Sequence, residues 1–186
     1  KTLPVEVIDM NKNSKLFQQY KVFRVPTLIV VDYAGAIGQP LREWLASLAE
    51  RSSAAEHPLR ILLLEREATA LYNELPGPTL IHLPGRRPEP LFVSVLTHGN
   101  ETTGFYAIQS LLQKYQDMEL PRALSLFIGN VDAARLGQRF LDSQPDYNRI
   151  WPGTGHAESE ETRMLQRVVD SMRARGAFAS IDVHNN

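Results

Sequence analysis

Residues 91–104 read LFVSVLTHGNETTG, and this stretch decides the fold class. Its first six residues, LFVSVL, are almost all apolar, which is typical of a strand that is buried on both faces of a sheet. From Thr103 to about Met118, apolar side chains recur at the spacing of an amphipathic helix: Phe105, Ile108, Leu111, Leu112, Tyr115 and Met118. We therefore expect a buried strand and a helix, joined by a polar turn that carries a histidine and a glutamate.

More strands and helices alternate on both sides of this stretch. We expect strands at RILLLE (60–65), PTLIHL (78–83), ALSLFIG (123–129) and AFASIDV (177–183), a proline-rich loop at PGRRPEP (84–90) and a helix over 158–176. A short helical or irregular piece joins the first two strands. This alternation predicts an α/β fold with a mostly parallel or mixed sheet and helices on both faces.

The first 51 residues form a stretch of their own. VEVIDM (5–10) and VPTLIVVD (25–32) indicate strands with a short helix between them, and LREWLASLAE (41–50) indicates a helix. Turn glycines at AGAIG (34–38) divide the later β-rich part, so the expected order is β-α-β-β-α. This order resembles the C-terminal half of a thioredoxin fold, with Val25-Pro26-Thr27 matching the segment where that family carries a cis-proline. The alternative is an ordinary βαβ-type packing unit. The resemblance implies a fold and no activity, because the chain has no cysteine.

Domain boundaries follow from composition. SSAAEHP (52–58) is small, polar and closed by proline, which predicts a linker or junction. The prediction is a thioredoxin-like partial domain at 1–51 and a larger α/β domain at 59–186. A natural fusion, a chimera and a truncated chain all stay open. Unpaired strand edges in half a sheet favour self-association, so a homo-oligomer is one expectation.

Composition limits the classes of partner. The net charge of −1 and the absence of a basic stripe argue against nucleic acid as the main partner. The apolar runs are too short for a membrane span, and no signal-like segment opens the chain, so we expect a cytoplasmic protein without a membrane partner. Without cysteine, any metal must be held by His, Asp or Glu.

Two histidines come directly after predicted strands. His98 follows strand 91–96, His184 follows strand 177–183, and Glu101 lies three residues after His98. Ligands of open α/β sheets collect at the carboxyl ends of strands, so these three side chains can converge. Two imidazoles and one carboxylate leave a fourth position open, which is the arrangement of catalytic zinc (Zn2+).

Four segments then occur in a telling order: THGNE, GNVDAARLGQRF, DYNRIWPG and IDVHNN. Together they resemble the zinc carboxypeptidase superfamily, in its aspartoacylase and succinylglutamate desuccinylase branch. The resemblance implies that His98, Glu101 and His184 bind zinc. It also implies that Arg139 polarises the scissile carbonyl, and that Asn148 and Arg149 grip a substrate carboxylate. Ser143-Gln144-Pro145 makes the stretch between Arg139 and Asn148 longer than in aspartoacylase-like sequences.

Each site residue also has a structural explanation. His98 could bond a neighbouring carbonyl, Glu101 could favour a helix start, and His184 could face solvent. Arg139 and Arg149 could form surface pairs with Asp142 and Asp146. Asp182 shares a strand face with His184 and could orient it. His156 is a substrate-side candidate, whereas His57 and His82 are interpreted as structural.

The resemblance implies hydrolysis of an amide bond next to a free carboxylate, on an N-acyl amino acid or a peptide C-terminus. The small-molecule or peptide substrate would therefore carry a carboxylate. In the relatives a general-base glutamate comes from a strand well after the third ligand. The sequence has two residues after His184, so we expect the general base to be missing and hydrolysis by this chain to be weak or absent. The alternatives are a non-catalytic thioredoxin-like binding or scaffold module and a chimeric or truncated chain without its own activity.

Overall fold

The structure is a computed structural model that describes residues 29–31, 40, 43, 63–75 and 77–185. Within these residues one five-stranded sheet has the order β1-β2-β4-β3-β5. Its strands are β1 (Ile29–Val31), β2 (Thr79–Leu83), β3 (Leu91–Val95), β4 (Leu124–Ile128) and β5 (Ala179–Asp182). The helices are α4 (Thr103–Lys114), α5 (Val131–Arg135) and α6 (Glu160–Ala174), with short 3-10 helices η2 (Ala68–Asn73) and η3 (Tyr147–Arg149).

The sheet is mixed, and its strand directions create one polar edge. β3 pairs in parallel with β4 on one side and with β5 on the other. β2 runs antiparallel to β4, and β1 runs parallel to β2. The carboxyl ends of β3, β4 and β5 therefore lie at the same end of the sheet, where α/β proteins bind their ligands.

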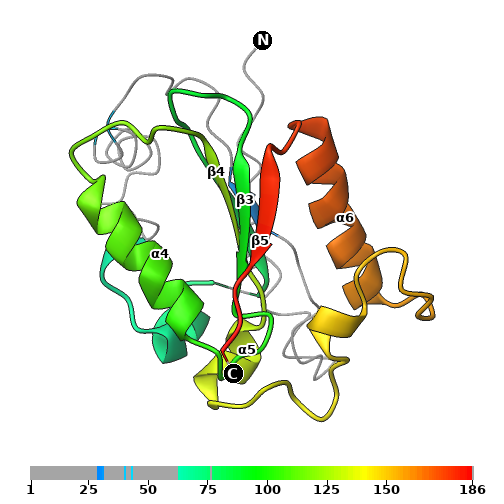
Figure 1. Cartoon of the computed structure of the whole chain (residues 1–186). Coiled ribbons are helices and arrows are strands. Elements are labelled where there is room, and N and C mark those ends of the chain that lie inside the picture. Colours follow the sequence, from blue (N-terminus) through cyan, green and yellow to red (C-terminus); the bar gives the residue numbers. More distant parts are fainter. Residues whose placement is uncertain (1–28, 32–39, 41–42, 44–62, 76, 186) are drawn as a thin grey trace, which may run out of the picture.

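Helices cover both faces of the sheet, as the alternation of elements predicts. Figure 1 shows α4 on one face and α6 on the other. On the α4 face, Val93 and Val95 pack with Phe105 and Leu112. The residues that pack on the α6 face form a second cluster: Leu80, Phe92, Phe127, Tyr147, Ile150, Met164, Leu165 and Val168. Alternate residues of β3 thus bury toward opposite helices, which fixes its register.

One predicted strand is wrong. RILLLE (60–65) was expected to be a strand, but Leu63 and Leu64 are helical and buried. A short apolar run cannot be told from a buried helical segment by periodicity alone, and burial is the property that this run encodes. The α4 helix also ends at Lys114, earlier than the predicted Met118.

Most of the thioredoxin-like prediction lies outside the described residues. The expected strand at 5–10, both helices apart from Glu43, and the junction at 52–58 cannot be compared with the structure. Ile29–Val31 is a strand within the predicted VPTLIVVD segment, and it pairs with β2. Among the described residues, no helix combines the length and apolarity that a bilayer crossing requires.

Two glycines permit close packing next to the polar edge. A Cβ at Gly99 would lie 2.2 Å from the backbone nitrogen of Ala134 in α5. A Cβ at Gly104 would lie 2.8 Å from a methyl carbon of Val183, just after β5. Both distances are below any real contact, so only glycine lets the turn after β3 and the start of α4 approach their neighbours this closely.

Candidate metal centre

His98 is delivered by a strained turn at the end of β3. Leu96 is buried and has a φ of +55°, a left-handed conformation that residues other than glycine rarely adopt. Its carbonyl accepts a hydrogen bond from the backbone nitrogen of Asn130 over 2.6 Å, which ties the turn to the end of β4. This turn redirects the chain so that the His98 side chain enters the sheet edge, where it is 1% exposed.

Glu101 completes the same turn. Its backbone nitrogen donates to the His98 carbonyl over 3.1 Å, and its side-chain Oε1 lies 2.9 Å from His98 Nδ1. Glu101 precedes α4 and is buried, with 7% of its surface exposed. A carboxylate in this position needs polar partners, because an unpaired buried charge is strongly unfavourable.

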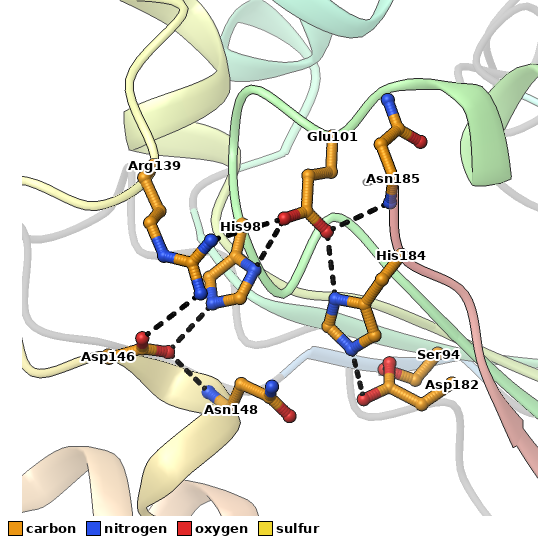
Figure 2. Close-up of polar contacts among 9 residues, drawn as sticks. All are labelled: Ser94, His98, Glu101, Arg139, Asp146, Asn148, Asp182, His184 and Asn185. Carbon is orange, nitrogen blue, oxygen red and sulfur yellow. Dashed lines mark hydrogen bonds and ion pairs between the residues drawn. The ribbon is translucent and has the colours of Figure 1, made fainter.

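His184 reaches the same carboxylate from β5. The backbone nitrogen of Val183 donates to the carbonyl of Ser94, which extends the β3–β5 pairing up to His184. His184 Nδ1 lies 2.8 Å from Glu101 Oε2, and the Asn185 backbone nitrogen donates to the same oxygen over 3.2 Å. The centroids of the His98 and His184 rings are 5.2 Å apart. Figure 2 shows Glu101 between the two rings.

This set fits a divalent metal ion. Each of His98, Glu101 and His184 offers one ligand atom, and these atoms all lie within 4.8 Å of one another. Both imidazoles turn the same nitrogen, Nδ1, toward Glu101. Two imidazoles and a carboxylate are donors that zinc accepts, and a three-ligand set leaves a coordination position open.

The outer nitrogens of both histidines are held by carboxylates. His98 Nε2 lies 2.8 Å from Asp146 Oδ1, and His184 Nε2 lies 2.7 Å from Asp182 Oδ2. Metal-binding histidines commonly donate their second ring N–H to a carboxylate, which fixes the tautomer and the ring orientation. The arrangement therefore leaves each Nδ1 facing the candidate metal position.

Burial and hydrogen bonds shift the pKa values of three ionisable groups at the site. Burial raises the pKa of Glu101, but hydrogen bonds from His184 and His98 outweigh it and bring the pKa below its ordinary value. Burial also raises the pKa of Asp146, and the hydrogen bond from His98 reverses this effect to a net lowering. For His184, burial lowers the pKa, whereas hydrogen bonds to Asp182 and Glu101 raise it above its ordinary value.

Arg139 links the two carboxylates around His98. Its guanidinium lies 3.4 Å from Glu101 Oε1 and 3.5 Å from Asp146 Oδ2. Its carbonyl accepts a hydrogen bond from the Gly99 backbone nitrogen over 3.0 Å, which places the residue beside the turn. The Arg139 side chain is 46% exposed. It forms an ion pair with an aspartate, as its structural explanation expects, and it also borders the candidate metal centre.

Asn148 and Arg149 lie in η3, directly after Asp146. Asp146 Oδ1 accepts a hydrogen bond from the Asn148 backbone nitrogen over 2.9 Å, which ties η3 to His98 through one carboxylate. Within the described part of the chain, neither the Asn148 carboxamide nor the exposed Arg149 guanidinium has a hydrogen-bond or ion-pair partner. Their roles as substrate-binding residues stay predictions.

Two further residues, Gln144 and Asp146, help to hold this site, and the sequence pattern does not identify them as site residues. The Gln144 side-chain oxygen accepts hydrogen bonds from Asn130 Nδ2 over 2.9 Å and from the Leu141 backbone over 3.2 Å, which fastens the loop between Arg139 and Asp146 to the sheet. The sequence pattern identifies Asp146 only as a partner of an arginine, although its place two residues before Asn148 in DYNR is a usable signal.

His82 and His156, the two other histidines that the structure describes, take no part in this cluster. His82 is buried and lies between Ser125 and Ser171, at 2.8 and 3.2 Å, in agreement with a structural role. His156 is exposed and lines a surface groove of about 300 Å³ with Trp151 and Arg163. His57 lies outside the described residues.

Relatives of the chain are found among curated proteins. A succinylglutamate desuccinylase of Pseudomonas paraeruginosa is 32% identical over 141 residues, which cover 71% of this chain and 42% of that protein. One of Burkholderia lata is 34% identical over 90 residues, covering 47% of this chain and 25% of that protein. The chain thus spans less than half the length of these relatives.

Solved structures give weaker matches. A succinylglutamate desuccinylase of Vibrio parahaemolyticus has a TM-score of 0.48 and 16% identity, covering 57% of this chain and 35% of that one. The enzyme of Chromobacterium violaceum has a TM-score of 0.42 and 25% identity, covering 59% and 38%.

A family model decides the assignment. The model of the succinylglutamate desuccinylase/aspartoacylase catalytic domain matches residues 89–186, which is just over half of the chain. The match includes β3 and the turn after it, the loop with Arg139 and Asp146, and β5 with His184. The expected resemblance to the aspartoacylase and succinylglutamate desuccinylase branch is confirmed. The chain belongs to the succinylglutamate desuccinylase/aspartoacylase family.

Proposed function

We propose that this chain carries the metal-binding part of a zinc-dependent amide hydrolase. The observation that carries the proposal is the convergence of His98, Glu101 and His184, whose ligand atoms lie within 4.8 Å of one another. When bound there, zinc would supply an acidified water and a polarised carbonyl. Asp146 and Asp182 would keep the histidine nitrogens in the orientation for binding, because each accepts from one Nε2.

The substrate class in this proposal is a small N-acyl amino acid or a peptide C-terminus with a free carboxylate. Relatives named succinylglutamate desuccinylase favour an acylated amino acid. Arg149 is exposed and unpaired among the described residues, and a guanidinium fits a carboxylate with two parallel hydrogen bonds. Asn148 would add a neutral donor beside it.

Arg139 would act on the carbonyl side of the substrate. Its guanidinium already borders Glu101 and Asp146, and nearly half of its side chain is exposed. It can therefore turn toward a bound substrate without leaving a buried charge unpaired. Positive charge aimed at a developing oxyanion lowers a barrier by roughly 3 kcal/mol.

The domain boundaries predicted from composition are also part of the proposal. SSAAEHP (52–58) would join the thioredoxin-like stretch at 1–51 to the α/β stretch at 59–186. Limited proteolysis tests this boundary: fast cleavage within 52–58 that leaves a stable 59–186 piece supports it. Cleavage spread evenly over both stretches contradicts it.

Zinc titration by calorimetry is the test of the metal site. We expect one zinc per chain, and a loss of affinity of more than about 100-fold in His98→Ala, because removing a ligand exceeds the 10–100-fold loss typical of an outer partner. His156→Ala is the matched control and should bind as wild type, since His156 lies on an exposed loop. Wild-type affinity in His98→Ala contradicts the proposal.

Substrate class is tested with the zinc-loaded chain. Succinylglutamate and its α-amide, which lacks one carboxylate, are compared as ligands in wild type and Arg149→Ala. We expect the amide and the variant each to weaken binding by about 10-fold or more, since each leaves a charged partner unpaired. Equal binding of both compounds contradicts the role of Arg149. Release of the amino acid product measures turnover, and weak or absent turnover stays a prediction.

A further inference from the structure

A buried hydroxyl lies behind His184. Ser94 of β3 and Asp182 of β5 are register partners in the parallel pair. The Ser94 hydroxyl donates a hydrogen bond to Asp182 Oδ1 over 2.8 Å, and the other oxygen of that carboxylate lies 2.7 Å from His184 Nε2. Ser94 is therefore connected to a candidate metal ligand through a single carboxylate (Figure 2).

Ser94 is an unusual residue for its place in the sheet. It is 1% exposed and lies in β3 between the buried Val93 and Val95. Burying a hydroxyl in an apolar strand is unfavourable unless it is hydrogen-bonded. Ser94 thus places a polar side chain in the core of the sheet, and among the described residues its hydroxyl has one acceptor, Asp182.

Asp182 depends on such a partner because its own strand gives it little support. All four residues of β5 are exposed, and the Asp182 side chain is 33% exposed. The terminal torsion of an aspartate is broad, so an unrestrained carboxylate samples many orientations. The hydrogen bond from Ser94 fixes one oxygen on the buried side of the strand, which leaves the other oxygen directed at His184.

We propose that Ser94 is a positioning residue for the candidate metal centre. It holds Asp182 in the orientation that keeps the proton of His184 on Nε2, which leaves Nδ1 free to bind a metal. The inference rests on the proposed function, since it requires an ion bound by His98, Glu101 and His184. It adds a residue of β3 that touches neither the ion nor a substrate.

The experiment compares three variants by zinc affinity, measured in competition with a chromogenic chelator. Ser94→Ala removes the donor and should weaken zinc binding about 3–10-fold, less than the 10–100-fold typical of direct outer partners. Ser94→Thr keeps the hydroxyl and should restore most of the affinity. Ser125→Ala is the matched control, because Ser125 is 2% exposed on the neighbouring strand and its hydroxyl contacts His82 instead. Its zinc affinity should equal that of wild type.

A second readout starts from the wild-type chain and follows the ring proton of His184. In zinc-loaded wild type, nitrogen NMR of the imidazoles should show His184 with its proton on Nε2 and slow exchange of that proton with solvent. In Ser94→Ala the exchange should become several-fold faster. A structural role in the sheet alone would change the thermal midpoint without changing this proton.

The outcomes separate the two proposals. If wild type binds zinc and His98→Ala does not, but Ser94→Ala binds as wild type, the role of Ser94 is overturned and the metal site stands. An equal loss in Ser125→Ala, or a His184 proton on Nδ1 in the loaded wild type, also overturns it. If wild type itself binds no zinc, the proposed function fails and the role of Ser94 fails with it.

Discussion

His98 and His184 offer the same nitrogen to the same carboxylate, but their surroundings differ sharply. The His98 side chain is 1% exposed and lies in a turn that is fixed by the strained Leu96 and the tightly packed Gly99. The His184 side chain is 28% exposed and follows β5, which lies at the edge of the sheet among the described residues and whose four residues are all exposed. The His98 half of the site therefore lies in the core, and the His184 half lies at the border of the core.

This difference shows that the two histidines of the candidate metal centre are held in orientation by different contacts. The His98 half has its orientation set by buried packing and by the Asp146 and Arg139 contacts. The His184 half lacks such packing, so its orientation depends on hydrogen bonds that reach back into the sheet through Asp182. We expect substitutions in the first half to change both folding and metal binding, and those in the second to change mainly metal binding.

The largest expected effect separates the two histidines. His98→Ala should lower the free energy of unfolding of the metal-free chain by about 2–4 kcal/mol, because His98 is 1% exposed and pairs with both Glu101 and Asp146. His184→Ala should cost about 1 kcal/mol or less, as expected for a partly exposed pair. Urea denaturation measures both, and the two variants should lose zinc affinity to a similar extent.

His156→Ala serves as the control in these measurements, since that side chain is exposed on a loop. Equal losses of stability in His98→Ala and His184→Ala would contradict the division into a buried and a border half.

The carboxylates behind the histidines should give the next largest effect. Asp146→Asn and Asp182→Asn each remove one carboxylate from an imidazole, which typically weakens metal binding about 10–100-fold. We expect Asp146→Asn to be the more harmful, because Asp146 also pairs with Arg139 and holds the Asn148 backbone. Chelator competition measures both affinities. Asp142→Asn, an exposed aspartate of the same loop, should have no effect, and a comparable loss there would argue against the assignment.

A smaller effect is expected from the loop that carries Arg139 and Asp146. Gln144→Ala removes the acceptor for Asn130 and for the Leu141 backbone, which should cost about 1 kcal/mol of unfolding free energy. Because the loop then moves more freely, amide hydrogen exchange over 139–146 should become faster. Gln138→Ala, an exposed residue of the same loop, provides the comparison. Unchanged exchange in Gln144→Ala would show that the loop is held by other contacts.

The smallest expected effect is a pH dependence of the metal-free chain. The raised pKa of His184 means that its contribution to stability is complete below the ordinary histidine pKa and disappears as pH rises through the raised pKa. The lowered pKa of Glu101 gives a contribution that is present above its ordinary pKa and lost as pH falls through the lowered one. We expect the free energy of unfolding of wild type to exceed that of His184→Gln at low pH. This difference should shrink as pH rises, by less than about 1 kcal/mol. A difference that stays constant across this range would contradict the contribution of His184.

The sheet and the convergence of ligands could be predicted because both follow from local patterns. LFVSVL (91–96) and PTLIHL (78–83) are apolar runs bounded by turn residues, and both are strands in the structure. His98 and His184 follow parallel neighbours in one sheet, so the rule that strand ends meet at one edge brings them together. The position of Glu101 is then fixed by the turn.

The remaining features depend on contacts that the pattern does not encode. Leu63 and Leu64 are apolar in a helix as they would be in a strand, so periodicity could not decide between the two. Ser94 is a single polar residue in an apolar strand, and its meaning appears only when β5 places Asp182 beside it. Gln144 likewise acquires a role through the fold of its own loop.

The central claim is that two imidazoles and one carboxylate hold a single divalent ion. Anomalous diffraction at the zinc edge, from crystals of the zinc-loaded chain, tests it directly. We expect one strong peak between His98 Nδ1, His184 Nδ1 and the Glu101 carboxylate. A zinc peak elsewhere, such as at His156, with none among these three side chains would contradict the account.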